Sequence, residues 1–132
     1  MPYLNWKNSP VELETLPHPK RDVQLLLKLS ETDMKTLTTS LEEVFSDPQA
    51  ELRLELPKNW TVFWKSREGE SRLLLAHPEH DTWVSTVSLD LPHGRLFLDA
   101  LKELRTPGDR ISPAESGAIG RVSNLDLILT LV

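Results

Sequence analysis

The sequence predicts an α+β fold, in which an antiparallel or mixed sheet of about six to seven strands carries two helices packed on one face. Residues 51–56 read Glu-Leu-Arg-Leu-Glu-Leu, and this alternation is typical of a strand with one buried and one exposed face. Three more strand-like runs follow, and two segments repeat apolar residues at helical spacing. The predicted order of elements is (β)-β-α-β-β-β-β-α-β, where the brackets mark a short first strand.

A strand and a helix are expected in the first third of the chain. Residues 22–29 place apolar side chains at every second position and add Leu26 on the opposite side, so the predicted strand is buried on both faces. Ser30 followed by Asp33 is close to a capping box, which predicts a helix over residues 31–45. The Asp-Pro pair that follows ends this helix.

The middle and the end of the chain supply the remaining elements. A second helix is expected over residues 92–105, because its first residue is a proline and its apolar residues share one stripe. The final strand, residues 125–132, is apolar on nearly both faces, and we expect it to pair with the strand at residues 22–29. Short links separate four middle strands and predict a meander. These strands are expected at residues 51–56, 60–65, 72–77 and 82–89.

The 132 residues are expected to form a single domain, because a chain of this length is too short for two ordinary ones. Residues 1–10 are expected to be a flexible arm, and residues 10–16 a short strand. Residues 106–123 are predicted to be a long loop. Within it, residues 112–115 read Ser-Pro-Ala-Glu, a capping-box pattern that predicts a short helical turn.

The composition indicates a folded cytoplasmic protein. The chain is 39% hydrophobic and 27% charged, and it contains no cysteine, which removes disulfides and thiolate metal sites. Its first residues lack the pattern of a signal peptide, and no stretch approaches the roughly 20 apolar residues that span a bilayer. We therefore expect no membrane association. The formal net charge of −5 argues against a general affinity for nucleic acid.

The sequence carries no signature of catalysis. No serine lies in a Gly-x-Ser-x-Gly turn and no Gly-rich phosphate loop follows a strand, so we expect no cofactor and favour a non-enzymatic protein. His77 and His80 share one predicted turn and His93 opens the second helix, which makes them the candidates for a metal site. They lack the helical i, i+4 spacing at which paired histidines converge, and a polar turn is the simpler interpretation.

One face of the predicted meander is the candidate binding surface. If the leucines of the first middle strand face the core, the alternation places an apolar stripe on the opposite face, with cations at its rim. Two alternatives stay open, because the long loop or the arm could cover this stripe, or a register shift could exchange the two faces. The candidate residues are Phe63, Leu74 and Val84 in the stripe and Arg53, Lys65 and Arg72 at the rim.

The leading functional hypothesis is a small cytoplasmic protein-interaction module without catalytic activity. It would bind a protein partner or a second copy of itself, as a homodimer, through the open sheet face or an edge strand. A second hypothesis is an acidic chaperone or immunity-type protein that binds a basic partner. A third is an enzyme or small-ligand carrier with a pocket between helices and sheet. The acidic hypothesis would use Glu12, Glu14, Glu42, Glu43 and Asp47.

A fourth hypothesis is binding of single-stranded nucleic acid. Four antiparallel strands followed by a helix form the unit of the whirly and transcription-cofactor single-stranded DNA binders, and residues 51–105 resemble that unit in the order of their elements. The resemblance implies a surface of cations and an aromatic ring. The residues available for it are Arg53, Lys65 and Arg72 with Phe63. The acidic net charge argues against it.

Overall fold

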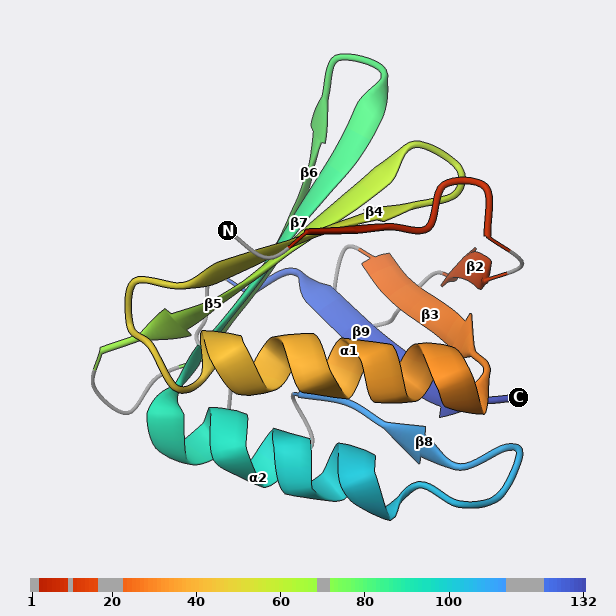
Figure 1. Cartoon of the computed structure of the whole chain (residues 1–132). Helices are drawn as coiled ribbons and strands as arrows, with labels where there is room; N and C mark the ends of the chain where they lie inside the picture. The colour runs from red at the N-terminus through yellow and green to blue at the C-terminus, as the bar shows by residue number, and fades with distance from the viewer. Residues whose placement is uncertain (1–2, 10, 17–22, 69–71, 114–122) are drawn as a thin grey trace.

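The α+β class is confirmed by the computed structural model, which describes residues 3–9, 11–16, 23–68, 72–113 and 123–132 (Figure 1). The predicted helices and strands are present, with bounds within two residues of those expected. In chain order the elements are β1 (Tyr3–Asn5), β2 (Glu12–Leu16), β3 (Val23–Leu29), α1 (Glu31–Val44), β4 (Glu51–Leu56), β5 (Trp60–Arg67), β6 (Arg72–Glu79), β7 (Thr82–Asp90), α2 (Leu91–Glu103), β8 (Arg110–Ile111) and β9 (Leu125–Leu131).

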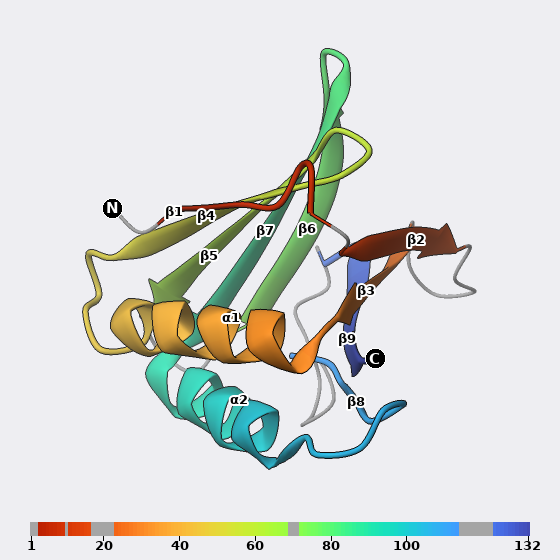
Figure 2. The same ribbon diagram turned by 45° about the vertical axis from the view of Figure 1, so that its right-hand side comes forward.

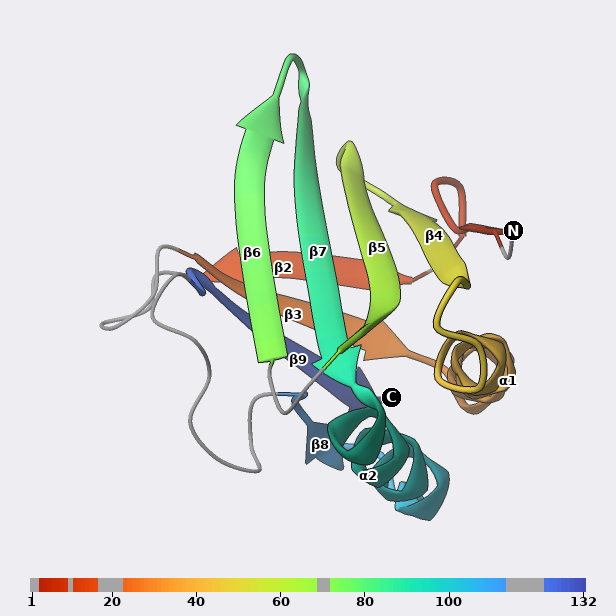
Figure 3. The same ribbon diagram turned by 90° about the vertical axis from the view of Figure 1, so that its left-hand side faces the viewer.

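The strands form two mixed sheets, where the sequence predicted one. Five strands pair in the order β1-β4-β5-β7-β6, and four pair in the order β2-β3-β9-β8. The two sheets lie face to face with their strands crossing (Figure 3), and one hydrophobic cluster includes residues of both. Leu25, Leu27 and Leu129 are at most 1% exposed in this core. The expected pairing of β3 with β9 is confirmed, and the two strands are parallel.

The expected meander is wrong in the middle of the larger sheet. The hairpins β4–β5 and β6–β7 are antiparallel as predicted, but β5 pairs with β7 in parallel and β6 lies at the edge. The register sets Trp60 beside Trp83, whose rings stack 5.3 Å apart, and the Trp60 indole N–H donates to Ser85 at 2.8 Å. The edge also suits β6 because its Pro78 has no N–H to donate to a second neighbour.

Both helices lie side by side beneath the larger sheet (Figures 1 and 2). The predicted cap of α1 is present, since Ser30 Oγ accepts the Asp33 N–H at 3.1 Å. Both helices contact β5 on the side that faces the core, and the ring of Phe97 in α2 stacks on Trp64 at 5.6 Å. The two helices and the smaller sheet therefore cover the same face of the five-stranded sheet, and no helix or strand in the described ranges covers its other face.

Two segments that were expected to lack structure contain strands. The arm at residues 1–10 contributes β1, which pairs in parallel with β4, and Trp6 is only 7% exposed. Burial of this ring and a hydrogen bond from the Trp6 N–H to the Glu55 carbonyl, 2.7 Å long, hold the described part of the arm in place. In the expected loop at 106–123, β8 pairs with β9. The helical turn expected at 112–115 is only half described, because residues 114 and 115 lie outside the described residues.

Candidate functional site

The outer face of the five-stranded sheet is the face turned away from the second sheet, and it stands open toward the viewer in Figure 3. One cross-strand row runs over all five strands in register. Its side chains comprise two aromatic rings, a cation, a threonine and a leucine, so this row is neither purely apolar nor purely polar. From β1 to β6 the row consists of Tyr3, Arg53, Phe63, Thr86 and Leu75.

Two of the three predicted stripe residues lie on this outer face, and the third does not. Phe63 and Val84 are half-buried there. Leu74 is fully buried on the inner face, because it pairs with the buried Val87 of β7. Its neighbours Leu73 and Leu75 take the outer positions instead and are half-buried. The apolar part of the outer face therefore consists of Tyr3, Phe63, Leu73, Leu75 and Val84.

The predicted cations are arranged less uniformly than expected. Arg53 donates to Glu55 Oε1 at 2.8 Å, and its guanidinium lies over the Tyr3 ring at 5.9 Å from the centroid. Lys65 is exposed on β5. Arg72 begins β6, and its side chain lies outside the described part of the structure. Of the three predicted rim cations, the structure therefore describes the side chains of Arg53 and Lys65.

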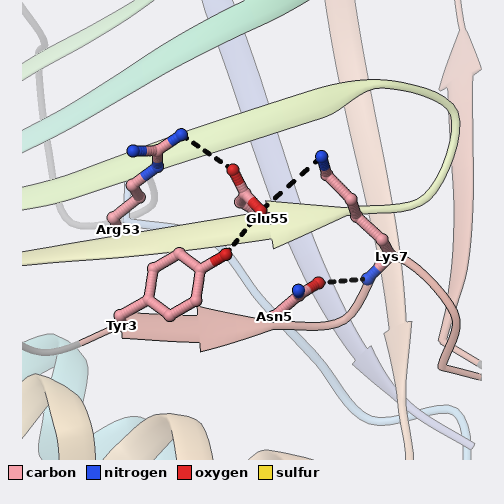
Figure 4. Close-up of polar contacts among 5 residues, drawn as sticks. All are labelled: Tyr3, Asn5, Lys7, Arg53 and Glu55. Atoms are coloured by element: carbon pink, nitrogen blue, oxygen red, sulfur yellow. Dashed lines mark hydrogen bonds and ion pairs between the residues drawn. The ribbon is translucent and has the colours of Figure 1, made fainter.

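A buried carboxylate organises one end of the outer face, and the sequence did not reveal it. Glu55 is 7% exposed and accepts a hydrogen bond of 2.6 Å from the Tyr3 hydroxyl (Figure 4). The Lys7 ammonium lies 3.6 Å from the same carboxylate. The Tyr3 hydrogen bond, with the nearby Lys7 and Arg53 charges, lowers the pKa of Glu55. The same hydrogen bond raises the pKa of Tyr3. This cluster fastens β1 to β4 and positions Arg53.

A shallow hollow of about 310 Å³ lies on the outer face beside this cluster. Its floor is formed by side chains of β5 and β7, and charged groups of both signs stand around it. Such a mixed lining suits a protein surface that presents an apolar side chain next to a polar one. The lining residues are Lys7, Arg53, Glu55, Asn59, Thr61, Phe63, Glu79, Thr82 and Val84.

The edge of this sheet at β6 is closed. Leu74 and Ala76 direct their backbone N–H and C=O groups away from β7, and these groups hydrogen-bond with Ser123 and Asn124. Pro78, the next residue with this orientation, has no N–H. Because free N–H and C=O groups are what a partner strand would pair with, this edge does not offer a continuous row for strand addition. Compared with this edge, the outer face is therefore the better candidate surface.

Of the three candidate histidines, His77 lies in β6, His80 in the turn that follows it and His93 in α2. His77 and His80 are exposed, and His80 occupies the hairpin turn with φ of 56°. His77 Nε2 lies 3.7 Å from Glu79. His93 is engaged at the start of α2, where its Nδ1 is 2.5 Å from Oδ1 of the buried Asp90. Within the described residues, no three His, Asp or Glu side chains are grouped as metal ligands.

A second concavity, of about 350 Å³, lies between α1, α2 and the end of β9. Its apolar lining comes from Met34, Leu101 and Leu131, which are at most 4% exposed, and from the half-buried Leu104. Charged side chains stand at its mouth, and three of the four are cations. They are Lys35, Lys102 and Arg105, with Glu31 as the anion. The lining corresponds to the pocket between helices and sheet that the ligand-carrier hypothesis requires.

Comparison with known proteins does not assign this chain to a family. No protein-family model matches the sequence, and a search of curated proteins returns no significant match. Neither helix in the described ranges is long and apolar enough to cross a membrane.

Proposed function

We propose that this chain is a non-catalytic protein-interaction module whose binding surface is the outer face of the five-stranded sheet. The observation that carries the proposal is the group of half-buried apolar side chains on that face, with Phe63 near its centre, where no described element covers them. Contiguous apolar groups on an open face favour association with another protein. A second copy of the chain is the first partner to test, as a homodimer.

The composition of the face supports a protein partner. Interfaces combine aromatic and aliphatic residues at the centre with arginine and polar groups around them. Phe63 and Tyr3 supply the rings, Arg53 is already held in place by Glu55, and Lys65 stands at the rim. Prior immobilisation of Arg53 lowers the side-chain entropy that binding would otherwise cost.

The test is light scattering after size-exclusion chromatography, over a dilution series at low and high salt. A homodimer held by the apolar face has a concentration-dependent mass that changes little with salt. Phe63→Asp should shift it to the monomer. The matched control is Leu96→Asp, because Leu96 is 58% exposed on α2, away from this face, and the same substitution there should leave the mass unchanged.

Circular dichroism separates loss of binding from loss of fold. Both variants should keep the wild-type spectrum and cooperative unfolding, because neither side chain is fully buried. A monomeric wild type that also captures no protein partner through Phe63 would contradict the proposal. An oligomer that Phe63→Asp leaves intact would contradict it equally.

The other hypotheses receive less support from the described residues. The acidic surface is divided: Glu12 and Glu14 pair with Lys28 near the start of α1, whereas Glu42, Glu43 and Asp47 lie near its end, about 20 Å away along the helix. The resemblance to single-stranded DNA binders was based on four antiparallel strands, whereas β5 and β7 are parallel. In addition, Arg53 is already paired with Glu55. A cytoplasmic location remains part of the proposal and is supported by the cysteine-free composition.

A further inference from the structure

The groove between α1 and α2 has properties that the interaction face does not explain. Its volume of about 350 Å³ lies within the size range of small-molecule sites, about 300–1,000 Å³. Met34 and Leu101 form its floor from the two helices, and Leu131 closes it from β9. The site is therefore assembled from three elements that are distant in the sequence, on a different part of the molecule from the outer face.

The floor of the groove presents no polar group in need of a partner. Thr38 is the buried hydroxyl-bearing residue of the lining, and its Oγ1 donates to the Met34 carbonyl at 2.8 Å. Its methyl group adds to the apolar surface formed by Met34 and Leu101. An occupant of the floor must accordingly be apolar, because a buried polar group there would lose its hydrogen bonds to water without replacement.

The mouth of the groove has the opposite character. The lining places Lys35, Lys102 and Arg105 there with the carboxylate of Glu31, in a chain whose formal net charge is −5. Lys35 pairs with Glu31 at 3.1 Å, with both side chains 76% exposed. Lys102 pairs with Glu42 at 2.7 Å, with both side chains about half exposed. Exposed pairs of this kind contribute about 0–1 kcal/mol, so a bound anion can exchange with them.

Arg105 is the best placed of these cations to hold an anion. One of its guanidinium nitrogens donates to the Lys102 carbonyl at 2.9 Å, in the last turn of α2. A planar guanidinium matches a carboxylate in a bidentate geometry. The apolar floor and the cationic mouth are thus adjacent parts of one site.

We propose that this groove binds an amphipathic anion, a carboxylate with a single alkyl chain. The chain lies on Met34, Leu101 and Leu131, and the carboxylate is held by Arg105 with Lys35 and Lys102 around it. This site is separate from the proposed interaction face, so a negative result for one proposal does not overturn the other.

The sequence offers a simple probe, because it contains two methionines, Met1 and Met34. Protein labelled with ¹³C at the methionine methyl groups is titrated with sodium decanoate below its micelle concentration, and Met34 reports on the groove directly. The Met34 signal should shift saturably, whereas the Met1 signal serves as the internal reference. Decyltrimethylammonium has the same chain and the opposite charge, and it should leave Met34 unchanged at equal concentration.

Charge and shape variants test the two halves of the site separately. Arg105→Glu should weaken decanoate binding on the order of tenfold through loss of the ion pair. Arg95→Glu makes the same change at an exposed position of α2 outside the lining and should leave affinity close to wild type. Thr39→Trp introduces a large ring at an exposed lining position and should abolish binding. Thermal unfolding of each variant establishes that it is folded.

Three results would overturn the proposal. The first is a Met34 signal that decanoate leaves unchanged up to its micelle concentration. The second is an equal response to decyltrimethylammonium, which would reduce the site to a nonspecific apolar surface. The third is a self-association that Thr39→Trp abolishes while no small anion binds, which would make a second copy of the chain the occupant of the groove.

Discussion

The side-chain amide of Asn124 hydrogen-bonds both backbone polar groups of Ala76. Its Oδ1 accepts the Ala76 N–H at 2.7 Å, and its Nδ2 donates to the Ala76 carbonyl at 2.8 Å. The Asn124 backbone N–H also donates to the Leu74 carbonyl, at 3.0 Å. Asn124, which immediately precedes β9, thereby makes the hydrogen bonds that a neighbouring strand would make with β6. It closes the edge of one sheet and joins it to the other.

Asn124→Ala should lower the free energy of unfolding by about 1–3 kcal/mol, because it leaves the N–H and carbonyl of Ala76 without these partners. Urea denaturation measures the change. Reopening the edge should also increase aggregation at high concentration. Asn124→Asp is the matched variant, since it retains an acceptor for the Ala76 N–H but places a second oxygen against the carbonyl. Wild-type stability in both variants would show that these hydrogen bonds contribute nothing.

Tyr3→Phe should destabilise the protein most near neutral pH. The lowered pKa of Glu55 means that its contribution is present above the ordinary glutamate pKa and is lost as the pH falls through the lowered value. The raised pKa of Tyr3 means that its contribution is present below the ordinary tyrosine pKa and is lost as the pH rises through the raised value. Urea denaturation of both proteins over a pH series measures the difference. A difference that does not vary with pH would contradict this account of the cluster.

Gly94→Ala should destabilise the protein although alanine is the better helix former. A Cβ at position 94 would lie 2.5 Å from Cδ1 of Phe45, whose ring is 1% exposed. Overpacking of this kind costs about 1–3 kcal/mol, which exceeds the gain in helix propensity of about 1 kcal/mol. Chemical denaturation gives the sign directly.

The close approach of the two helices predicts a specific rescue of this variant. Phe45→Ala removes Cδ1, Cγ and Cε1, the three ring atoms nearest to position 94, so the double variant should be more stable than the sum of the two single changes implies. If the changes in the free energy of unfolding of the two single variants simply add in the double variant, the cost of Gly94→Ala does not come from its contact with Phe45.

His93→Ala should cost about 3 kcal/mol, because it removes the partner of a buried carboxylate. Asp90 is 0% exposed, and within the described residues its Oδ2 has no hydrogen-bond partner, so His93 carries the interaction at Oδ1. Thermal and urea denaturation measure the loss. Adding Asp90→Asn to His93→Ala removes the buried charge and should recover part of the stability. A double variant less stable than His93→Ala would contradict this explanation.

Much of the secondary structure could be predicted because it depends on neighbours in the sequence. The spacing of Met34, Leu37 and Leu41, with Ser30 as the cap, was enough to place α1 to within one residue at its end. The pairing of β3 with β9 was also predictable, since a strand that is apolar on both faces must be covered on both. Two of the three predicted stripe residues followed in the same way, because Phe63 and Val84 lie in strands with clear alternation.

Tertiary contacts decided the remainder. Leu73, Leu74 and Leu75 are identical residues in succession, so alternation cannot tell which of them faces inward, and pairing with β7 settles it. Glu55 has the pattern of an exposed strand residue and becomes buried through Tyr3, which is 52 positions away. The groove needs α1, α2 and β9 together. Local periodicity determines which residues of an element share a face, whereas the partner of that face depends on contacts between distant segments.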